Sequence, residues 1–140
     1  MRNAILKIVV ALVSAVVGYV LVAGVLGLRH AEGSLDSRLA RVADNMNQQL
    51  PIMADAETRL DKVTAGPGSQ LTYAFTLPNQ NKTNLDLPAF EKTLRQIIIN
   101  NYKTNSSMVE MRTAQVKLVC LYKDKTGEVI TNIAVTPKDF

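Results

Sequence analysis

Asp55, Glu57, Arg59 and Asp61 form the densest group of side chains in this sequence that could take part in chemistry. Two or three carboxylates held close together can bind a cation or act as an acid–base pair, as in a hydrolase. Alternation along a strand, however, would place Glu57, Arg59 and Asp61 on one face, where Arg59 neutralises its neighbours. We therefore predict structural ion pairs or a partner-recognition role for these four residues rather than metal binding or catalysis.

The rest of the sequence offers few residues for catalysis or metal binding. Cys120 is the only cysteine and His30 the only histidine, which excludes an intrachain disulfide and a zinc site of several cysteines. Cys120 lies between Val119 and Leu121 and is predicted to be a core residue. No phosphate-binding loop, dinucleotide fingerprint or nucleophile elbow occurs. The sequence thus predicts a protein that is not an enzyme, without cofactor or metal.

An apolar segment near the N-terminus indicates a membrane anchor. Residues 8–28 are 21 consecutive residues without a charge, and about 20 apolar residues in a helix span the hydrocarbon core of a bilayer. We expect a short cytoplasmic tail at 1–7 and a transmembrane helix at 8–28, with the positive-inside rule favouring a cytoplasmic N-terminus. An uncleaved anchor is favoured over a signal peptide, whose apolar region is shorter. The expected location is a bacterial inner membrane, single-pass, with residues 29–140 in the periplasm.

The charge balance argues against nucleic acid as a partner. The chain carries a formal charge of +4, and residues 29–140 hold 14 of the 16 basic and all 12 acidic residues. A net charge of +2 over the exported part gives no broad basic footprint. Small residues at four-residue spacing in the apolar segment permit close approach of two such helices, so a homo-oligomer is allowed but not required.

Hydrophobic periodicity in residues 29–140 predicts a small α+β domain. Helical patterns cover about 35–49 and the residues from about 88 to 102. β-prone segments lie at 58–64, 71–77, 116–122 and 128–135, with turn residues between the members of each pair. The expected order is therefore helix, two strands, helix, two strands, forming an antiparallel sheet backed by the helices.

Several short stretches of this part resemble a family of small bacterial membrane-anchored exported domains of unknown function. They are NQQLPIM at 47–53, ETRLD at 57–61, LTYAFTL at 71–77, NNY at 100–102, YKDKTG at 122–127 and VTPKD at 135–139. The resemblance implies an exported accessory domain and brings no catalytic residues with it. It also implies a cysteine pair, but the matching positions here are Lys103 and Phe140, so this chain lacks the family's disulfide.

The leading hypothesis is a membrane-tethered, non-catalytic interaction or accessory domain, with the lipid bilayer and another membrane or exported protein as partners. The alternative is a small-molecule ligand-binding or sensing domain in the periplasm, using a groove between the first helix and the sheet. A hydrolase built on the acidic group around Asp61 is a third reading.

Overall fold

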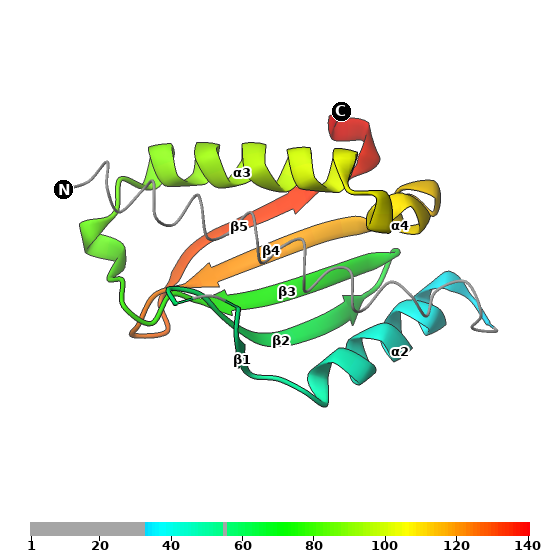
Figure 1. Ribbon diagram of the computed structural model, residues 1–140, viewed down its shortest axis with the longest axis horizontal. Helices are drawn as coiled ribbons and strands as arrows, with labels where there is room; N and C mark the ends of the chain where they lie inside the picture. Colours follow the sequence, from blue (N-terminus) through cyan, green and yellow to red (C-terminus); the bar gives the residue numbers. More distant parts are fainter. Residues whose placement is uncertain (1–32, 55) are drawn as a thin grey trace.

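The computed structural model describes residues 33–54 and 56–140, which form one α+β domain (Figure 1). Its helices are α2 (Leu35–Asn47), α3 (Leu87–Thr104) and α4 (Val109–Thr113). Its strands are β1 (Ile52–Met53), β2 (Arg59–Gly66), β3 (Gln70–Thr76), β4 (Lys117–Lys123) and β5 (Val129–Val135). Single 3-10 turns occupy Lys82–Asn84, Ser106–Met108 and Pro137–Asp139.

Both long helices begin where the sequence places a cap. The Ser34 side chain accepts a hydrogen bond from the Ser37 N–H at the start of α2, and the Asp86 side chain does the same for the Ala89 N–H in α3. Such caps satisfy backbone donors that have no partner within the helix. Proline in the first turn of α3 also suits a helix start, because its missing N–H is not needed there. The two predicted helices and the α+β class are confirmed.

The sheet is mixed, so the expected antiparallel sheet is wrong. Its strand order is β1-β2-β3-β4-β5, and β3 pairs with β4 in parallel while the other neighbours pair antiparallel. The reason is the single long helix between the two hairpins. α3 carries the chain back along the sheet, so β4 starts at the same end as β3 and must run parallel to it. The two-residue strand β1, which extends the sheet beyond β2, was not predicted because so short a segment carries no alternation.

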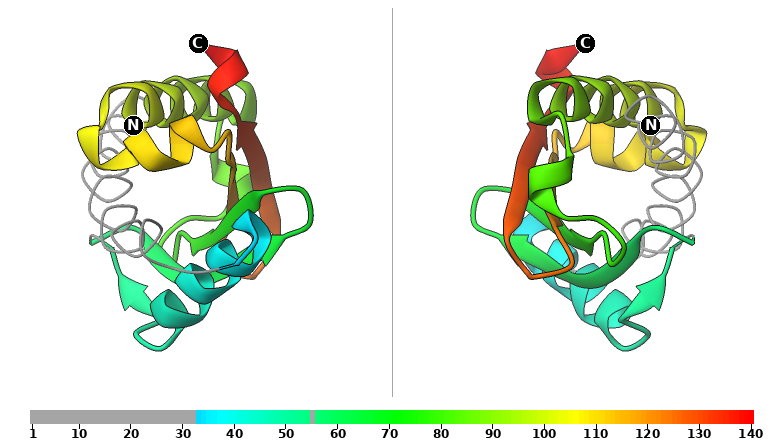
Figure 2. Two further views of the ribbon diagram at one scale, coloured as in Figure 1. Left: turned by 90° about the vertical axis from the view of Figure 1, so that its right-hand side faces the viewer. Right: turned by 90° about the vertical axis from the view of Figure 1, so that its left-hand side faces the viewer.

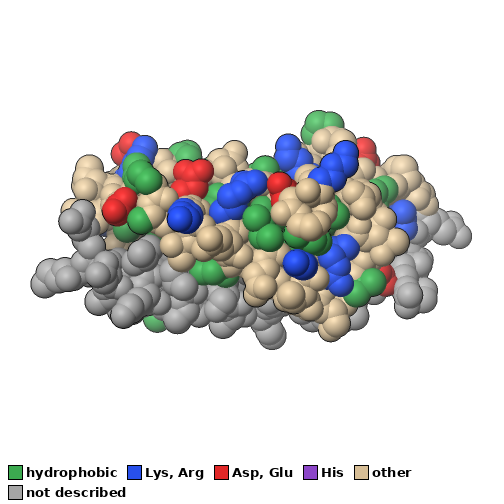
Figure 3. All heavy atoms as spheres, turned by 90° about the horizontal axis from the view of Figure 1, so that it is seen from above, with side chains coloured by type: hydrophobic (Ala, Val, Ile, Leu, Met, Phe, Trp, Pro, Cys, Tyr) green, Lys and Arg blue, Asp and Glu red, His purple; other side chains and the backbone are tan. Residues whose placement is uncertain are grey.

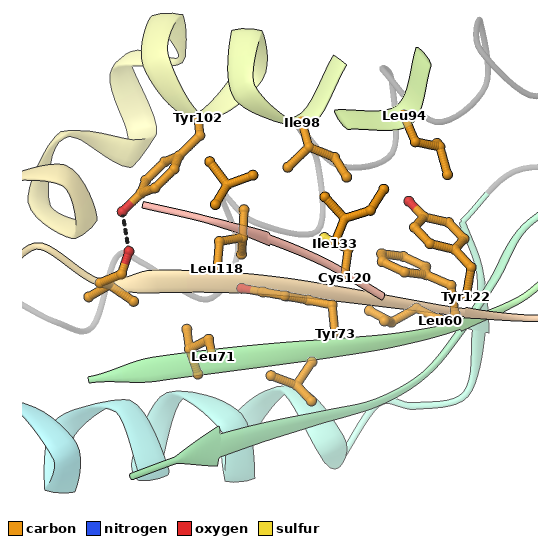
Figure 4. Close-up of a cluster of buried hydrophobic side chains, with 14 of the residues drawn as sticks. Leu60, Leu71, Tyr73, Leu94, Ile98, Tyr102, Leu118, Cys120, Tyr122 and Ile133 are labelled. Carbon is orange, nitrogen blue, oxygen red and sulfur yellow. Dashed lines mark hydrogen bonds between the residues drawn. The ribbon is translucent and has the colours of Figure 1, made fainter. Parts of the chain in front are cut away.

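One face of the sheet, the inner face, carries the core. Alternate residues of β3 and β4 point into it, so Phe75 lies against Tyr122 with ring centroids 5.0 Å apart and Phe90 of α3 meets Tyr122 edge-on at 6.3 Å. Tyr102 of α3 donates its hydroxyl to the Val116 carbonyl at 2.7 Å (Figure 4). The side views place α3 and α4 toward the β5 end of the sheet and α2 toward the β1 end (Figure 2).

Side chains from the helices occupy backbone groups at both edges of the sheet. The Asn47 amide of α2 donates to the Val63 carbonyl at 2.7 Å and accepts from the Val63 N–H at 2.8 Å. At the other edge, Arg95 of α3 donates to the Ala134 carbonyl of β5 at 3.3 Å. Unpaired backbone groups at a sheet edge can pair with a strand of another chain, and these contacts block the two edges at Val63 and Ala134.

The expected membrane span lies outside the described residues, as do the predicted tail at 1–7 and residues 29–32 of the predicted exported domain. Within 33–54 and 56–140, no helix has the length and apolarity needed to cross a bilayer. The described residues therefore do not support the expected single-pass architecture with an N-terminal transmembrane helix, or the expected inner-membrane location. What the structure supports is an α+β domain whose described helices all pack on or beside its own sheet.

Candidate partner-binding surface

Strand β2 brings the predicted Arg59 and Asp61 together on the face of the sheet opposite the core. Arg59 Nε donates to Asp61 Oδ1 at 2.5 Å, and the Thr76 hydroxyl of β3 donates to Asp61 Oδ2. A β-bulge between Leu60 and Lys62 makes this arrangement possible, because the extra residue is Asp61 itself. The carboxylate is thereby held by two donors and is not open to act as a base.

The other two predicted residues do not join this pair. Glu57 lies in a bend before β2, where its carboxylate accepts a hydrogen bond from the Asn79 side chain at 3.1 Å. Asp55 lies outside the described residues. Within 33–54 and 56–140, no group of three or more histidine, cysteine, aspartate or glutamate side chains could hold a metal ion.

The pairing of the strands extends the Arg59–Asp61 group into a surface, which we call the outer face. Cross-strand partners align Met53, Arg59, Thr76, Lys123 and Val129 in one row across all five strands. The next row contains Lys62, Ala74, Leu121 and Asn132, and the one after it Thr64, Thr72, Val119 and Ala134. A last row contains Gly66, Gln70 and Lys117.

The outer face has an apolar and threonine-rich middle with cations around it. Lys62 and Lys117 are exposed and Lys123 is half-buried, while the Arg59 side chain is 41% exposed. None of the three lysines forms an ion pair or side-chain hydrogen bond in the part of the chain that the structure describes. These rows contain no acidic residue, and Asp61, in the bulge of β2 beside them, is already held by Arg59 and Thr76.

Sequence reasoning missed the lysines of this surface. Alternation in 71–77 and 116–122 shows that Thr72, Thr76 and Lys117 share the face away from the core. Gathering them with Lys62 and Lys123, however, requires the parallel pairing of β3 with β4, which the sequence did not reveal.

The groups with shifted pKa values have structural roles. Burial raises the pKa of the Cys120 thiol to about 12, and the residue is 1% exposed, which confirms it as a core residue. Burial likewise raises the pKa of Tyr73, which faces Cys120 across the β3–β4 pair. Both groups are therefore protonated at neutral pH, and a protonated thiol is a poor nucleophile.

Asp124 has the opposite shift, for a reason found in the loop between β4 and β5. Its side chain accepts hydrogen bonds from the Thr126 hydroxyl and from the backbone N–H groups of Lys82, Thr126 and Glu128. These donors, the Thr126 hydroxyl first among them, lower the pKa of Asp124 to about 2. The carboxylate ties the 82–84 turn to the β4–β5 loop.

The groove expected between the first helix and the sheet is filled. Leu39, Val42 and Ala43 of α2 are 0–5% exposed because they pack toward β2 and β3. This interface is part of the core, so a ligand would have to displace it.

Comparison with known proteins shows similarity of fold alone. No family model matches the chain, and no curated protein matches it. Among solved structures, it is similar to the type II secretion system pilotin AspS from Vibrio cholerae, with 13% identity and a TM-score of 0.57 over 76% of this chain and 92% of that one.

Two further structures have the same fold. The type 2 secretion system pilotin EpsS from Vibrio vulnificus matches at 11% identity and a TM-score of 0.58, covering 74% of this chain and 89% of that one. A Pseudomonas aeruginosa protein described as secreted matches at 13% identity and a TM-score of 0.59, covering 75% of this chain and 95% of that one.

Proposed function

We propose that this chain is a non-catalytic accessory domain that works by binding a protein partner. The observation that carries the proposal is the outer face, where one whole side of the sheet has no described helix packed on it. A domain with no binding role has little reason to leave three unpaired lysines around a half-buried apolar middle, since charges interspersed with opposite charges keep a surface soluble.

Two comparisons point in the same direction. The fold is shared with pilotins of type II secretion systems, which are accessory parts of a larger assembly, and with a protein described as secreted. The stretches that resemble small bacterial exported domains add to this. We therefore place the partner among exported proteins or the components of an export assembly.

A catalytic role is less well supported than partner binding, because the acidic side chains are engaged in hydrogen bonds within the domain. Asp61 is engaged by Arg59 and Thr76, and Asp124 accepts three hydrogen bonds within its own loop and a fourth from the Lys82 N–H. The hydrogen bonds to Asp124 lower its pKa, which is the opposite of what a general acid needs at neutral pH.

Cross-linking in the native cells tests the proposal. The full chain, affinity-tagged, is captured after cross-linking and its adducts are identified and counted by mass spectrometry. We expect one protein adduct in a fixed ratio to the bait. The control is Leu118→Asp, which places a charge at a core position that is 0% exposed and should unfold the sheet. Equal adducts from both baits, or none from the native chain, would contradict the proposal.

A further inference from the structure

We propose that the outer face binds an acidic segment of the partner protein, with carboxylates placed over Lys62, Lys117 and Lys123. This inference rests on the proposed protein-binding function and adds the surface and the chemistry of the partner. It follows from the placement of charge on the two sides of the molecule, the state of the sheet edges, and the composition of the middle of the face.

The outer face has an excess of positive charge, in contrast to the helical side of the domain. In the view from above, lysine, arginine and acidic side chains are interspersed over the α3 side (Figure 3). There the exposed cations are Lys92, Arg95, Lys103 and Lys138, and the exposed acids are Asp86, Glu91 and Asp139. Arg95 and Asp139 also pair directly at 3.4 Å. On the outer face, four cations stand against Asp61 alone.

The cations are close enough for one extended acidic segment to reach more than one of them. Lys62 and Lys123 are on strands separated by one other strand and lie in neighbouring rows, so their backbones are about 12 Å apart. About four residues of an extended chain span this distance, so carboxylates of a single segment can lie over both lysines. The acids at the ends of the strands are engaged elsewhere, because Glu128 pairs with Lys82 at 3.2 Å and Glu57 accepts from Asn79.

Because the sheet edges are partly blocked, a peptide is more readily bound on the outer face than added as a further strand at an edge. A peptide adds to a sheet through free backbone groups at an edge. Asn47 occupies the N–H and the carbonyl of Val63 in β2, and Arg95 occupies the carbonyl of Ala134 in β5. The edge strand β1 has only two residues. The face itself has no such cover from the described helices.

The middle of the face favours a protein segment over other anions. Leu121, Ala74 and Ala134 are half-buried and Val119 is 6% exposed, which gives an apolar floor inside a charged rim. Protein interfaces have this anatomy. Surfaces that bind single-stranded nucleic acids rely on aromatic stacking, and the rows of the outer face hold no aromatic residue. Anionic membranes bind clusters of four to eight basic residues, whereas the outer face offers three lysines, because its fourth cation, Arg59, is paired with Asp61.

The first test is a titration that locates the binding surface. Isotope-labelled full-length protein, kept in non-ionic detergent, is titrated with a peptide of glutamate, leucine and serine and followed by amide chemical shifts. We expect the largest shifts at Thr72, Leu121 and Asn132, and affinity that falls as salt rises from about 0.05 M to about 0.5 M. Shifts that centre on α3 or on the sheet edges would overturn the inference.

Matched charge reversals separate the surface from net charge. The variant Lys62→Glu/Lys123→Glu should bind the peptide about tenfold or more weakly, and Lys92→Glu/Lys103→Glu on α3 should change affinity by less than about twofold. The two variants have the same net charge, so equal weakening would overturn the inference. The amide spectrum of each variant checks that it is folded. Stronger outer-face shifts with phosphatidylglycerol vesicles or duplex DNA than with the peptide would also overturn it.

The same variants separate failure of this inference from failure of the proposed function. If the outer-face reversal captures the cellular partner as well as the native chain does, the partner binds elsewhere and the inference fails while the function stands. If the native chain captures no partner but the peptide still binds the outer face, the proposed function fails and the chemistry assigned to the surface stands.

Discussion

The side chain of Asn47 pairs with the backbone of Val63 as a neighbouring strand would. Its amide donates to the Val63 carbonyl at 2.7 Å and accepts from the Val63 N–H at 2.8 Å. One residue at the end of α2 thus fixes the helix to β2 and closes a strand edge. The closed edge leaves the outer face as the open surface of the sheet.

Replacing Asn47 should destabilise the domain. Asn47→Ala leaves the N–H and carbonyl of Val63 without these partners, so we expect the free energy of unfolding to fall by about 1–3 kcal/mol. Urea unfolding followed by circular dichroism measures the change. Asn100→Ala, at an exposed position of α3, is the control and should change stability by less than about 0.5 kcal/mol. Equal effects would mean that the Asn47 contacts contribute nothing specific.

Asp124 should make stability depend on pH in the acid range. Its pKa in the folded protein, about 2, lies below its ordinary value of 3.8. A carboxyl group whose pKa is lowered in the folded protein stabilises the fold at pH values above its ordinary pKa. This stabilisation is lost as the pH falls from about 4 to about 2. Thermal unfolding across this interval should show the melting temperature falling as acid is added.

Two substitutions test this assignment. Asp124→Asn removes the charge and replaces one accepting carboxylate oxygen with a donating amide group. It should therefore lower the melting temperature at pH 7 and make the melting temperature depend less on pH between pH 4 and pH 2. Asp44→Asn, at an exposed position of α2, should leave that dependence as it is. An unchanged acid profile in Asp124→Asn would show that other carboxyl groups are responsible.

The Cys120 thiol should be unreactive until the domain unfolds. It is 1% exposed and its pKa is raised to about 12, so access and thiolate content are both low at neutral pH. A thiol-specific reagent should label the native protein only at the rate of unfolding and the urea-unfolded protein at once. Fast labelling of the native protein would contradict burial. Cys120→Ser should cost about 1–3 kcal/mol, because it buries a hydroxyl in apolar surroundings.

The Arg59–Asp61 ion pair should contribute little to stability. Their side chains are 41% and 29% exposed, so water and salt screen the attraction. A double-mutant cycle with Arg59→Ala and Asp61→Ala should give a coupling energy of about 0.2–1 kcal/mol that shrinks in high salt. A coupling above about 2 kcal/mol would mark the pair as a main support of the bulge in β2.

Local signals in the sequence were enough for most elements of the fold. Ser34 and Asp86 mark the helix starts, and the alternation of Leu71, Tyr73 and Phe75 identifies β3 and its buried face. The direction in which β4 pairs is not a local property, because it depends on where α3 returns the chain. That one error hid the outer face, since Thr76 and Lys123 become neighbours only in the parallel register.

The acidic group is a second case in which spacing alone was insufficient. Simple alternation would have put Glu57 on β2 with Arg59 and Asp61. The strand instead begins at Arg59, and the bulge at Asp61 turns its carboxylate toward Thr76. A bulge depends on the partner strand, so no pattern within 57–61 could have indicated it.

Site-specific photo-cross-linking from the outer face tests the central claim most directly. A photoreactive residue replaces Asn132, an exposed position on β5, in the full chain in its native cells, and Gln96 on α3 serves as the control position. We predict a single protein adduct from position 132, none from position 96, and a cross-linked peptide rich in aspartate and glutamate. An adduct from position 96 alone, or no protein adduct from either position, would contradict the claim that this domain binds a protein partner through the outer face of its sheet.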